Sequence, residues 1–479
     1  MEKSEKKLRD IEIENGEIIG IEYLEEKSPE LQGIRLGTVP ERCCVRVKLR
    51  PTKESDILVE LWMPLSGWNG NFLGTGNGGF AGRIDELALI NGISRGYAVA
   101  NTDLGSSLNP DDLIGKQERW KDFGYRATHL MTLVSKKLIK AFYFKEPRYA
   151  YFMGGSTGGQ QALMEAQRYP EDYDGIIAIA PANNRVHLHT AFIWNWKALT
   201  EIEGKGISLE EADAITNQVL KYYAAASGSN AGEAFMSYPH KVSFDMQIFD
   251  ELIKKKVLKA GQAEALKKIY RGPVDPVTGE QIFVPMVPGS ENGNLGLAEQ
   301  GKREKFAADF FYLFRWIFGK EFNPEEFDFH RDLKTASEKL SPVLDATETD
   351  ISGFKQRGGK LLMLSGTADP IIPYTDAMNY YNRVIEEEHG IENTQKFFRY
   401  FLVPGLAHVF GGPGVQDIGM LGLDIFPKDK RHDVLAALAA WVEKGEAPDA
   451  IYPVAYKKGL FGRELDYEKK IHPYRGKAL

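Results

Sequence analysis

One stretch, residues 148–183, constrains the fold of this chain more than any other. A short apolar run at 149–153 leads into Gly-Gly-Ser-Thr-Gly at 154–158, and good helix formers follow up to Arg168. A second apolar run, at 175–180, has the composition of a buried parallel strand. The stretch therefore predicts a strand, a sharp turn, a helix and another strand, which is the context in which the pattern G-x-S-x-G becomes meaningful.

The predicted turn makes Ser156 a candidate nucleophile. Flanking glycines permit a strained backbone there, because side chains would collide with the strand or the helix. The turn would lift the Ser156 hydroxyl out of the sheet and place the N–H of Thr157 near a helix N-terminus, where it could stabilise an oxyanion. The alternative is a glycine-rich turn with an incidental serine, since this short pattern often arises by chance.

A second glycine-rich segment, Trp-Asn-Gly-Asn-Phe-Leu-Gly-Thr-Gly-Asn-Gly-Gly-Phe-Ala-Gly at 68–82, is predicted to follow a strand. Bare backbone N–H groups can approach a ligand closely at such a loop. We expect the second oxyanion donor here, with Gly78 as the candidate, and we expect Gly79 and Phe80 to contact substrate. A packed structural turn is the alternative, whereas a phosphate loop would need the ending G-K-[ST].

Two further polar residues each follow a predicted strand late in the chain. Asp369 comes shortly after the apolar run at 358–366, and His408 comes after the run at 399–403. Carboxyl ends of parallel strands share one edge of a sheet, so both side chains should lie near Ser156. The order serine, aspartate, histidine is that of the α/β hydrolases. In this reading His408 takes the serine proton and Asp369 orients the imidazole. The predicted fold class is α/β, with a mostly parallel hydrolase sheet.

Residues 184–345 show helical segments without a β-α alternation, and they are too many for a loop. We therefore predict an inserted, mostly helical lid domain between two parts of the hydrolase core, 1–183 and 346–479. Aromatic residues are frequent in the lid, and Trp194 and Phe311 are our candidates for contacts with an aromatic or apolar substrate. For each of them, packing inside the lid is the alternative.

Three histidines outside this order are not expected to be catalytic. His129 lies on a predicted helix at 122–142, where we expect it to be packed and hydrogen-bonded. His187 and His189 could be metal ligands, but roles in the lid core or in a pocket wall are favoured. The chain has no H-E-x-x-H motif. We therefore expect neither a metal nor another cofactor.

Charge and cysteine content restrict the possible partners and compartment. The net charge of −7 and the pI of about 5.9 argue against nucleic acid or an anionic membrane as partner. No apolar stretch reaches the length of a membrane span. The charged first residues show no signal peptide, and the two cysteines, Cys43 and Cys44, are adjacent and read as reduced. These features favour the cytoplasm, although the removal of a signal peptide stays open. Whether the protein forms a homo-oligomer also stays open.

The two ends of the chain have simpler patterns. Residues 8–62 alternate short β-like runs with turns, which predicts antiparallel strands leading into the main sheet. Residues 433–444 predict a final helix with Gly445 just past its end. The tail beyond that glycine reads as a loop that covers the sheet edge.

Several longer motifs make the chain similar to the tannase and feruloyl esterase family of α/β hydrolases. They are the glycine-rich segment at 68–82, D-F-G-Y-R-A-T-H at 122–129, G-G-S-T-G-G-Q-Q-A-L-M-E-A-Q-R-Y-P at 154–170, I-Y-R-G-P-V-D at 269–275, G-G-K-L-L at 358–362 with A-D-P at 368–370, and V-P-G-L-A-H at 403–408. The resemblance implies hydrolysis of small-molecule esters of hydroxylated aromatic acids, such as gallate or ferulate. An esterase for another acyl group is the alternative. A catalytically silent binding protein on the same fold is disfavoured, because all three triad candidates are kept.

The chain departs from that family at two places. Members commonly carry a disulfide beneath the triad, between a cysteine before the nucleophile and one after the histidine. Here Gly155 and Val409 stand at those positions, so packing must replace the covalent link. Many members also have an aspartate-rich calcium loop early in the lid. The segment at 227–233 lacks that pattern, and we expect no calcium there.

Overall fold

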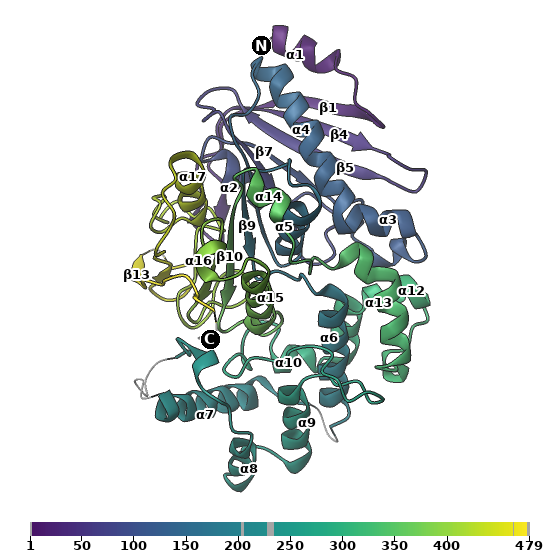
Figure 1. Ribbon diagram of the computed structural model, residues 1–479, viewed down its shortest axis with the longest axis vertical. Helices are drawn as coiled ribbons and strands as arrows, with labels where there is room; N and C mark the ends of the chain where they lie inside the picture. The colour runs from purple at the N-terminus through teal and green to yellow at the C-terminus, as the bar shows by residue number, and fades with distance from the viewer. Residues whose placement is uncertain (1, 203–205, 228–233, 463, 477–479) are drawn as a thin grey trace.

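The computed structural model describes residues 2–202, 206–227, 234–462 and 464–476, and its centre is a nine-stranded sheet (Figure 1). The strand order is β1-β4-β5-β7-β6-β8-β9-β10-β11. Strands β6 to β11 run parallel, whereas β1, β4 and β5 form an antiparallel extension that joins them through β7. The strand bounds are β1 Gly16–Leu24, β4 Arg42–Leu49, β5 Ile57–Pro64, β6 Phe72–Thr75, β7 Ala98–Thr102, β8 Ala150–Gly155, β9 Gly175–Ile179, β10 Lys360–Gly366 and β11 Phe398–Val403.

Helices cover both faces of this sheet, because its parallel strands are apolar on both sides. One face packs against α2 (Glu86–Ile93) and α17 (Val434–Lys444). The other packs against the helices α4 (Ala127–Tyr143), α5 (Thr157–Arg168), α14 (Ser352–Gln356) and α15 (Tyr374–Glu387) (Figure 1). Each face forms its own apolar cluster, so the core consists of two layers separated by the sheet.

Between β9 and β10 the described part of the chain consists of helices joined by loops, with one isolated bridge between Val274 and Gln281, and it adds no strand to the sheet. Its α-helices before α14 are α6 (Arg185–Thr200), α7 (Leu209–Ser227), α8 (Gln247–Lys254), α9 (Ala260–Arg271), α10 (Leu297–Gln300), α11 (Arg303–Phe310), α12 (Tyr312–Phe318) and α13 (Arg331–Leu344). Figure 1 shows α7, α8 and α9 at the end of the molecule opposite α1 (Glu2–Arg9). This segment has the helical character expected of the lid, and the division into domains stays a prediction.

The predicted antiparallel strands near the N-terminus are present as β1, β4 and β5. Cys43 and Cys44 lie on β4, both buried and both free thiols. Burial raises the pKa of each thiol to about 12, so neither is a ready nucleophile. The expectation of reduced cysteines in a strand is confirmed.

The C-terminal part also follows its pattern. Asp433 caps α17 by accepting the N–H of Leu435, and Gly445 ends the helix in the left-handed conformation at φ 72°. Beyond it the N–H of Tyr474 donates to the carbonyl of Tyr400 at 2.7 Å, so the tail covers the edge strand β11. The sequence did not predict the small pair β12 (Val454–Tyr456) and β13 (Leu465–Glu468). The remaining short strands and α-helices are β2 Glu30–Leu31, β3 Ile34–Arg35, α3 Gln117–Lys121 and α16 Ile391–Thr394. The described residues also form three short 3-10 helices, η1 Pro110–Leu113, η3 Pro239–Lys241 and η4 Pro324–Glu326, and a π-helical turn, η2 Asp122–Arg126, directly before α4.

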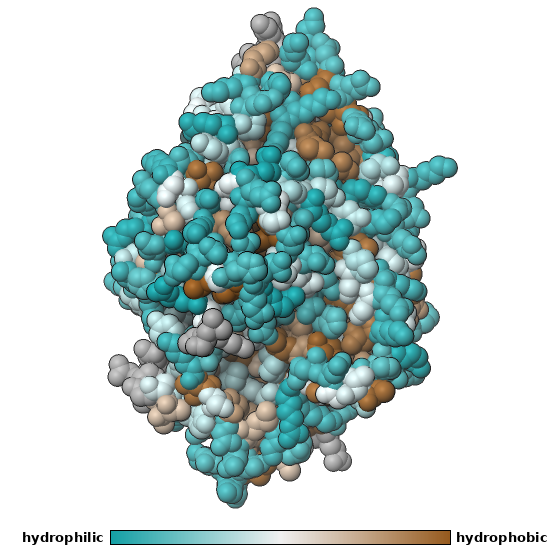
Figure 2. All heavy atoms as spheres, viewed as in Figure 1, coloured by the Kyte–Doolittle hydropathy of each residue, from teal (hydrophilic) through white to brown (hydrophobic). Residues whose placement is uncertain are grey.

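Hydrophilic side chains dominate the face drawn in Figure 2, and apolar ones gather near its upper end. Ile13, Leu130 and Leu133 line an apolar depression beside α4, and Leu133 is 47% exposed. None of the helices that the structure describes has the length and apolar character to cross a membrane.

Candidate active site

Ser156 lies at the turn between β8 and α5, with a backbone φ of 61° and ψ of −118°. A serine at such a positive φ is strained, and the hydrogen bonds of its own N–H and carbonyl hold it in this conformation. Its N–H donates to the carbonyl of Ile179 at 2.9 Å, and its own carbonyl accepts the N–H of Ala182 at 3.1 Å. Both partners belong to β9 or to the loop that follows it, so the neighbouring strand fixes the turn.

Glycines around this turn let three backbone segments touch. A Cβ on Gly76 would stand 2.4 Å from the Cα of Gly158, and one on Gly154 would stand 2.5 Å from the Gly158 carbonyl oxygen. Real Cβ atoms do not approach this closely, so a side chain at these positions would push the loop, strand or helix apart. The expected steric role of the glycines is therefore confirmed.

Asp369 and His408 hydrogen-bond at the same edge of the sheet. Oδ2 of Asp369 lies 2.7 Å from Nδ1 of His408. The other oxygen, Oδ1, accepts the N–H groups of Ile371 and Ile372, each at 3.0 Å. The carboxylate is fully buried, whereas the His408 side chain is 20% exposed. An acceptor at Nδ1 fixes the tautomer with its proton on Nδ1, which leaves Nε2 as a base.

The sequence neighbours of Ser156 and His408 touch. A Cβ placed on Gly155 would lie 2.8 and 2.9 Å from the two methyl groups of Val409. The valine side chain thus fills the space beside Gly155, and the expectation that packing replaces a covalent link is confirmed. The contact also brings the turn of Ser156 and the loop of His408 together.

The glycine-rich loop runs beside the N-terminus of α5. The carbonyl of Asn77 accepts the N–H of Gly158 at 2.8 Å, and the N–H of Asn77 donates to Oε1 of Gln161 at 2.9 Å. Gly78 and Gly79 follow, both exposed, and a Cβ on either would meet open space. Among the hydrogen bonds of the described residues, none uses the N–H of Thr157 or Gly78. A vacant N–H is what an oxyanion donor requires, and both assignments stay predictions.

The aromatic candidates occupy different surroundings. Phe80 is half-buried, and its ring packs edge-on against Tyr312 at 5.7 Å. Trp194 donates its indole N–H to the carbonyl of Lys268 at 3.1 Å. Phe311 is 1% exposed and belongs to the apolar cluster that also includes residues of the sheet, where its ring packs edge-on against Trp196 at 5.5 Å. These placements give Trp194 and Phe311 packing roles, and substrate contact stays a prediction for all three.

The two lid histidines have the roles expected of them. His187 lines a polar cavity of about 660 Å³ together with Asp345, Asp376 and Arg383. His189 is packed in the lid core, with Nδ1 2.7 Å from the carbonyl oxygen of Phe310. Burial lowers the pKa of His189 to about 3, so its imidazole is neutral. The expectation that the segment 227–233 holds no calcium stays a prediction, because residues 228–233 lie outside the described part of the chain.

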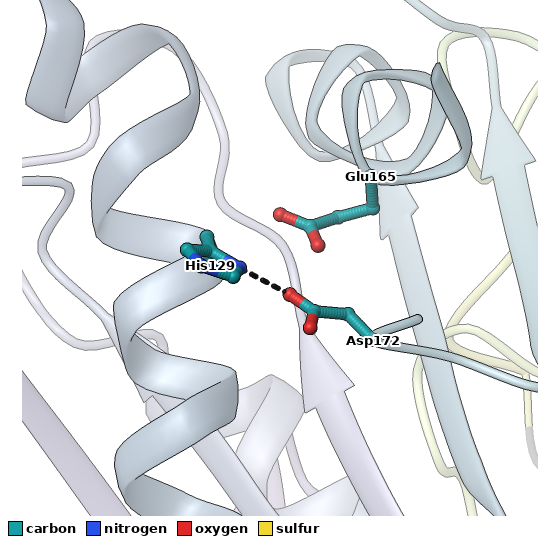
Figure 3. A group of neighbouring side chains, drawn as sticks. All are labelled: His129, Glu165 and Asp172. Atoms are coloured by element: carbon teal, nitrogen blue, oxygen red, sulfur yellow. Dashed lines mark hydrogen bonds and ion pairs between the residues drawn. The ribbon is translucent and has the colours of Figure 1, made fainter. Parts of the chain in front are cut away.

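His129 on α4 faces the carboxyl groups of Glu165, on α5, and of Asp172, in the loop after α5 (Figure 3). Its Nδ1 lies 2.6 Å from Oδ2 of Asp172, and its ring stacks on Tyr169 at 3.8 Å, which confirms the packed, hydrogen-bonded role. By residue type this group could hold a cation together with Glu165. Two ligands of one such ion lie about 3 Å or more apart at bonds of about 2.0–2.2 Å, so the 2.6 Å contact fits a proton better.

Sequence reasoning missed Arg185, the first residue of α6. Its side chain is 2% exposed, and it donates hydrogen bonds to both the nucleophile turn and the glycine-rich loop. A single arginine at the start of a helix has no spacing signature. Only the crossing of three segments in the fold reveals its contacts.

Comparison with known proteins identifies the class and the family to which this chain belongs. The parallel sheet, the serine turn and the aspartate–histidine pair after later strands define an esterase of the α/β-hydrolase fold. The sequence model of the family described as tannase and feruloyl esterase matches residues 43–466, and the chain belongs to this family. The protein is therefore a carboxylic ester hydrolase.

Individual relatives agree with this assignment. An uncharacterized esterase of Xanthomonas campestris is 34% identical over 88% of this chain and 79% of its own length. A probable feruloyl esterase B-2 of Aspergillus flavus is 30% identical over 86% of this chain and 80% of its own. The crystal structure of an esterase from Aspergillus oryzae superposes with a TM-score of 0.87 at 25% identity, covering 98% of this chain and 95% of that one.

Proposed function

We propose that this esterase hydrolyses esters of hydroxylated aromatic acids, of the feruloyl or galloyl type, through an acyl-enzyme on Ser156. The observation that carries the mechanism is the strained backbone of Ser156, at φ 61°, on the sheet edge where Asp369 and His408 hydrogen-bond. The acyl class is supported by relatives whose names specify it, such as the probable feruloyl esterase B-2 of Aspergillus flavus.

In the proposed first step, Oγ of Ser156 attacks the ester carbonyl carbon while Nε2 of His408 accepts the hydroxyl proton. Asp369 keeps the other ring nitrogen protonated and stabilises the imidazolium. The negative charge moves to the carbonyl oxygen, which the N–H groups of Thr157 and Gly78 would bind. When the tetrahedral intermediate collapses, the bond to the alcohol breaks and His408 returns the proton to the leaving oxygen.

In the second step, water replaces the alcohol. His408 removes a proton from the water as its oxygen attacks the acyl carbon, and the same oxyanion donors are used again. Collapse then breaks the bond to Oγ, Ser156 regains its proton and the aromatic acid leaves. This sequence needs no group beyond the side chains and N–H groups already described.

Labelling with a fluorophosphonate probe tests the proposed nucleophile. We expect stoichiometric labelling of the wild type and none of Ser156→Ala, measured by intact mass and peptide mapping. Ser365→Ala is the matched control, since Ser365 is 1% exposed and out of reach of the probe. Labelling that persists in Ser156→Ala, or folded wild type that is not labelled, would refute the mechanism.

A further inference from the structure

Arg185 is a buried cation whose partners are neutral oxygens. Its two terminal nitrogens donate to the Thr157 hydroxyl, at 3.1 and 3.2 Å, to Gln160 Oε1, at 3.0 Å, to the Gly79 carbonyl, at 3.0 Å, and to the Tyr312 hydroxyl. One face of the guanidinium lies over the ring of Phe123, 5.0 Å from its centroid. Among the described residues no carboxylate forms an ion pair with it, so the positive charge stays uncompensated.

These bonds join the two segments that carry the oxyanion-donor candidates. The Thr157 hydroxyl accepts from Arg185 and donates to the carbonyl of Gly79 at 2.6 Å. The peptide between Gly79 and Phe80 is therefore held by two donors on its oxygen. The preceding peptide is held by the N–H of Ala81, which donates to the Gly78 carbonyl at 3.0 Å. Together the contacts fix the orientation of an exposed loop that has few side chains of its own.

The charge of Arg185 adds to this mechanical effect. A neutral donor could satisfy the same oxygens, whereas burying a cation without a counter-ion is unfavourable. Its field in a low-dielectric site favours negative charge nearby, and such a charge develops on the substrate carbonyl in the transition state. The bond to Tyr312 also ties this arrangement to α12 of the lid.

We propose that Arg185 is a positioning residue that locks the glycine-rich loop to the nucleophile turn and so preorganises the oxyanion site. The inference rests on the serine mechanism proposed above. Because oxyanion contacts strengthen only in the transition state, the loss of Arg185 should lower kcat much more than it changes KM. A displacement of about 1 Å at such a site can cost about 10²-fold in rate.

The test compares Arg185→Met and Arg185→Lys with the wild type, using p-nitrophenyl butyrate and active-site concentrations from fluorophosphonate titration. We expect kcat to fall about 10²-fold in Arg185→Met, with KM within about threefold. An aryl trifluoromethyl ketone, whose adduct with Ser156 carries an oxyanion, should bind about 10²-fold more weakly. Arg185→Lys keeps the positive charge but lacks the planar set of guanidinium N–H donors, so it should recover part of the loss in kcat and in ketone affinity.

The matched control is Arg42→Met. Arg42 is 3% exposed and also donates to backbone carbonyls, but it lies on β4, away from the site. We expect it to lower the melting temperature while kcat per active site stays unchanged. If Arg185→Met keeps the wild-type kcat and ketone affinity, the inference is wrong. Failure of the wild type to react with fluorophosphonate would instead refute the proposed mechanism.

Thr157→Val keeps the inference testable if Arg185→Met does not fold. This variant retains side-chain shape and the backbone N–H, but it removes the hydroxyl that bridges Arg185 and Gly79. We expect a smaller fall in kcat, about tenfold, with ketone affinity lowered by the same factor. Unchanged kcat and ketone affinity in folded Thr157→Val would overturn the proposed lock.

Discussion

At the scale of single residues, the His408 loop depends on an unusual valine. Val409 has a φ of 69°, and the N–H of Phe410 donates to the carbonyl of His408 at 2.8 Å, which closes a three-residue turn around it. This conformation is strained for a β-branched residue. The side chain is nevertheless buried against Gly155, so packing holds the strained turn beside the catalytic-histidine candidate.

The same contact predicts that a disulfide can be installed. A Cβ on Gly155 would lie 3.4 Å from that of Val409, close to the usual separation of about 3.5–4.5 Å in disulfides. Gly155→Cys combined with Val409→Cys should form the bond on oxidation and stabilise the fold by about 2–4 kcal/mol. Intact mass, thiol titration in denaturant and melting with and without dithiothreitol measure both effects.

Gly155→Cys alone is the control for this prediction. Without the second substitution, the new side chain meets the methyl groups of Val409 at 2.8–2.9 Å. Overpacking of this kind destabilises a core by about 1–3 kcal/mol, so the single variant should melt below the wild type. An oxidised double variant whose thiols all remain free would show that the two loops are not in this contact.

At the scale of elements, α4 and α5 meet through a buried acid group. Glu165 on α5 is 1% exposed, and no hydrogen-bond partner of the ionised carboxylate is present among the described residues. It faces Asp172 and His129 (Figure 3). Nearby, Lys136 donates to the Asp172 carbonyl. Burial, reinforced by the charge of Asp172, raises the pKa of Glu165 well above its usual value, so the side chain holds its proton.

The raised pKa of Glu165 predicts that the difference in stability between the wild type and Glu165→Gln depends on pH. Above a pH of about 4.3 the unfolded chain releases the Glu165 proton while the folded chain keeps it, so its contribution is lost as the pH rises toward the folded pKa. Because Gln cannot titrate, the stability of Glu165→Gln relative to the wild type should increase from pH 5 to pH 8. Melting temperatures across this range measure the difference. Parallel curves would mean that Glu165 is ionised in the folded protein.

The longer helices and strands around the site could be predicted because each carries its own local signal. The strand before Ser156 and the helix after it are contiguous in sequence, and Gly445 marks the end of α17 by its αL conformation. The contacts of Arg185 and Glu165 have no such signal. Each depends on which helices meet across several segments, and a buried ionisable residue is indistinguishable from an exposed one in a sequence pattern.

At the scale of the whole molecule, the sequence reveals more about the hydrolase core than about the helical segment between β9 and β10. The core alone predicts acyl transfer, because order and spacing place Ser156, Asp369 and His408 after parallel strands. Substrate contacts could not be predicted equally well. Aromatic residues such as Phe311 pack in the apolar core by the same hydrophobicity that would suit an aromatic acid, and burial separates the two roles only once the fold is known.

Initial rates with methyl ferulate, methyl gallate and p-nitrophenyl butyrate, for the wild type and Ser156→Ala, test the central claim most directly. Removing the nucleophile should lower turnover by at least about 10⁴-fold while the melting temperature stays near that of the wild type. The account predicts that wild type has its highest kcat/KM for one of the two phenolic esters. Efficient turnover of the butyrate alone would contradict the proposed acyl class, and full activity in Ser156→Ala would contradict the mechanism itself.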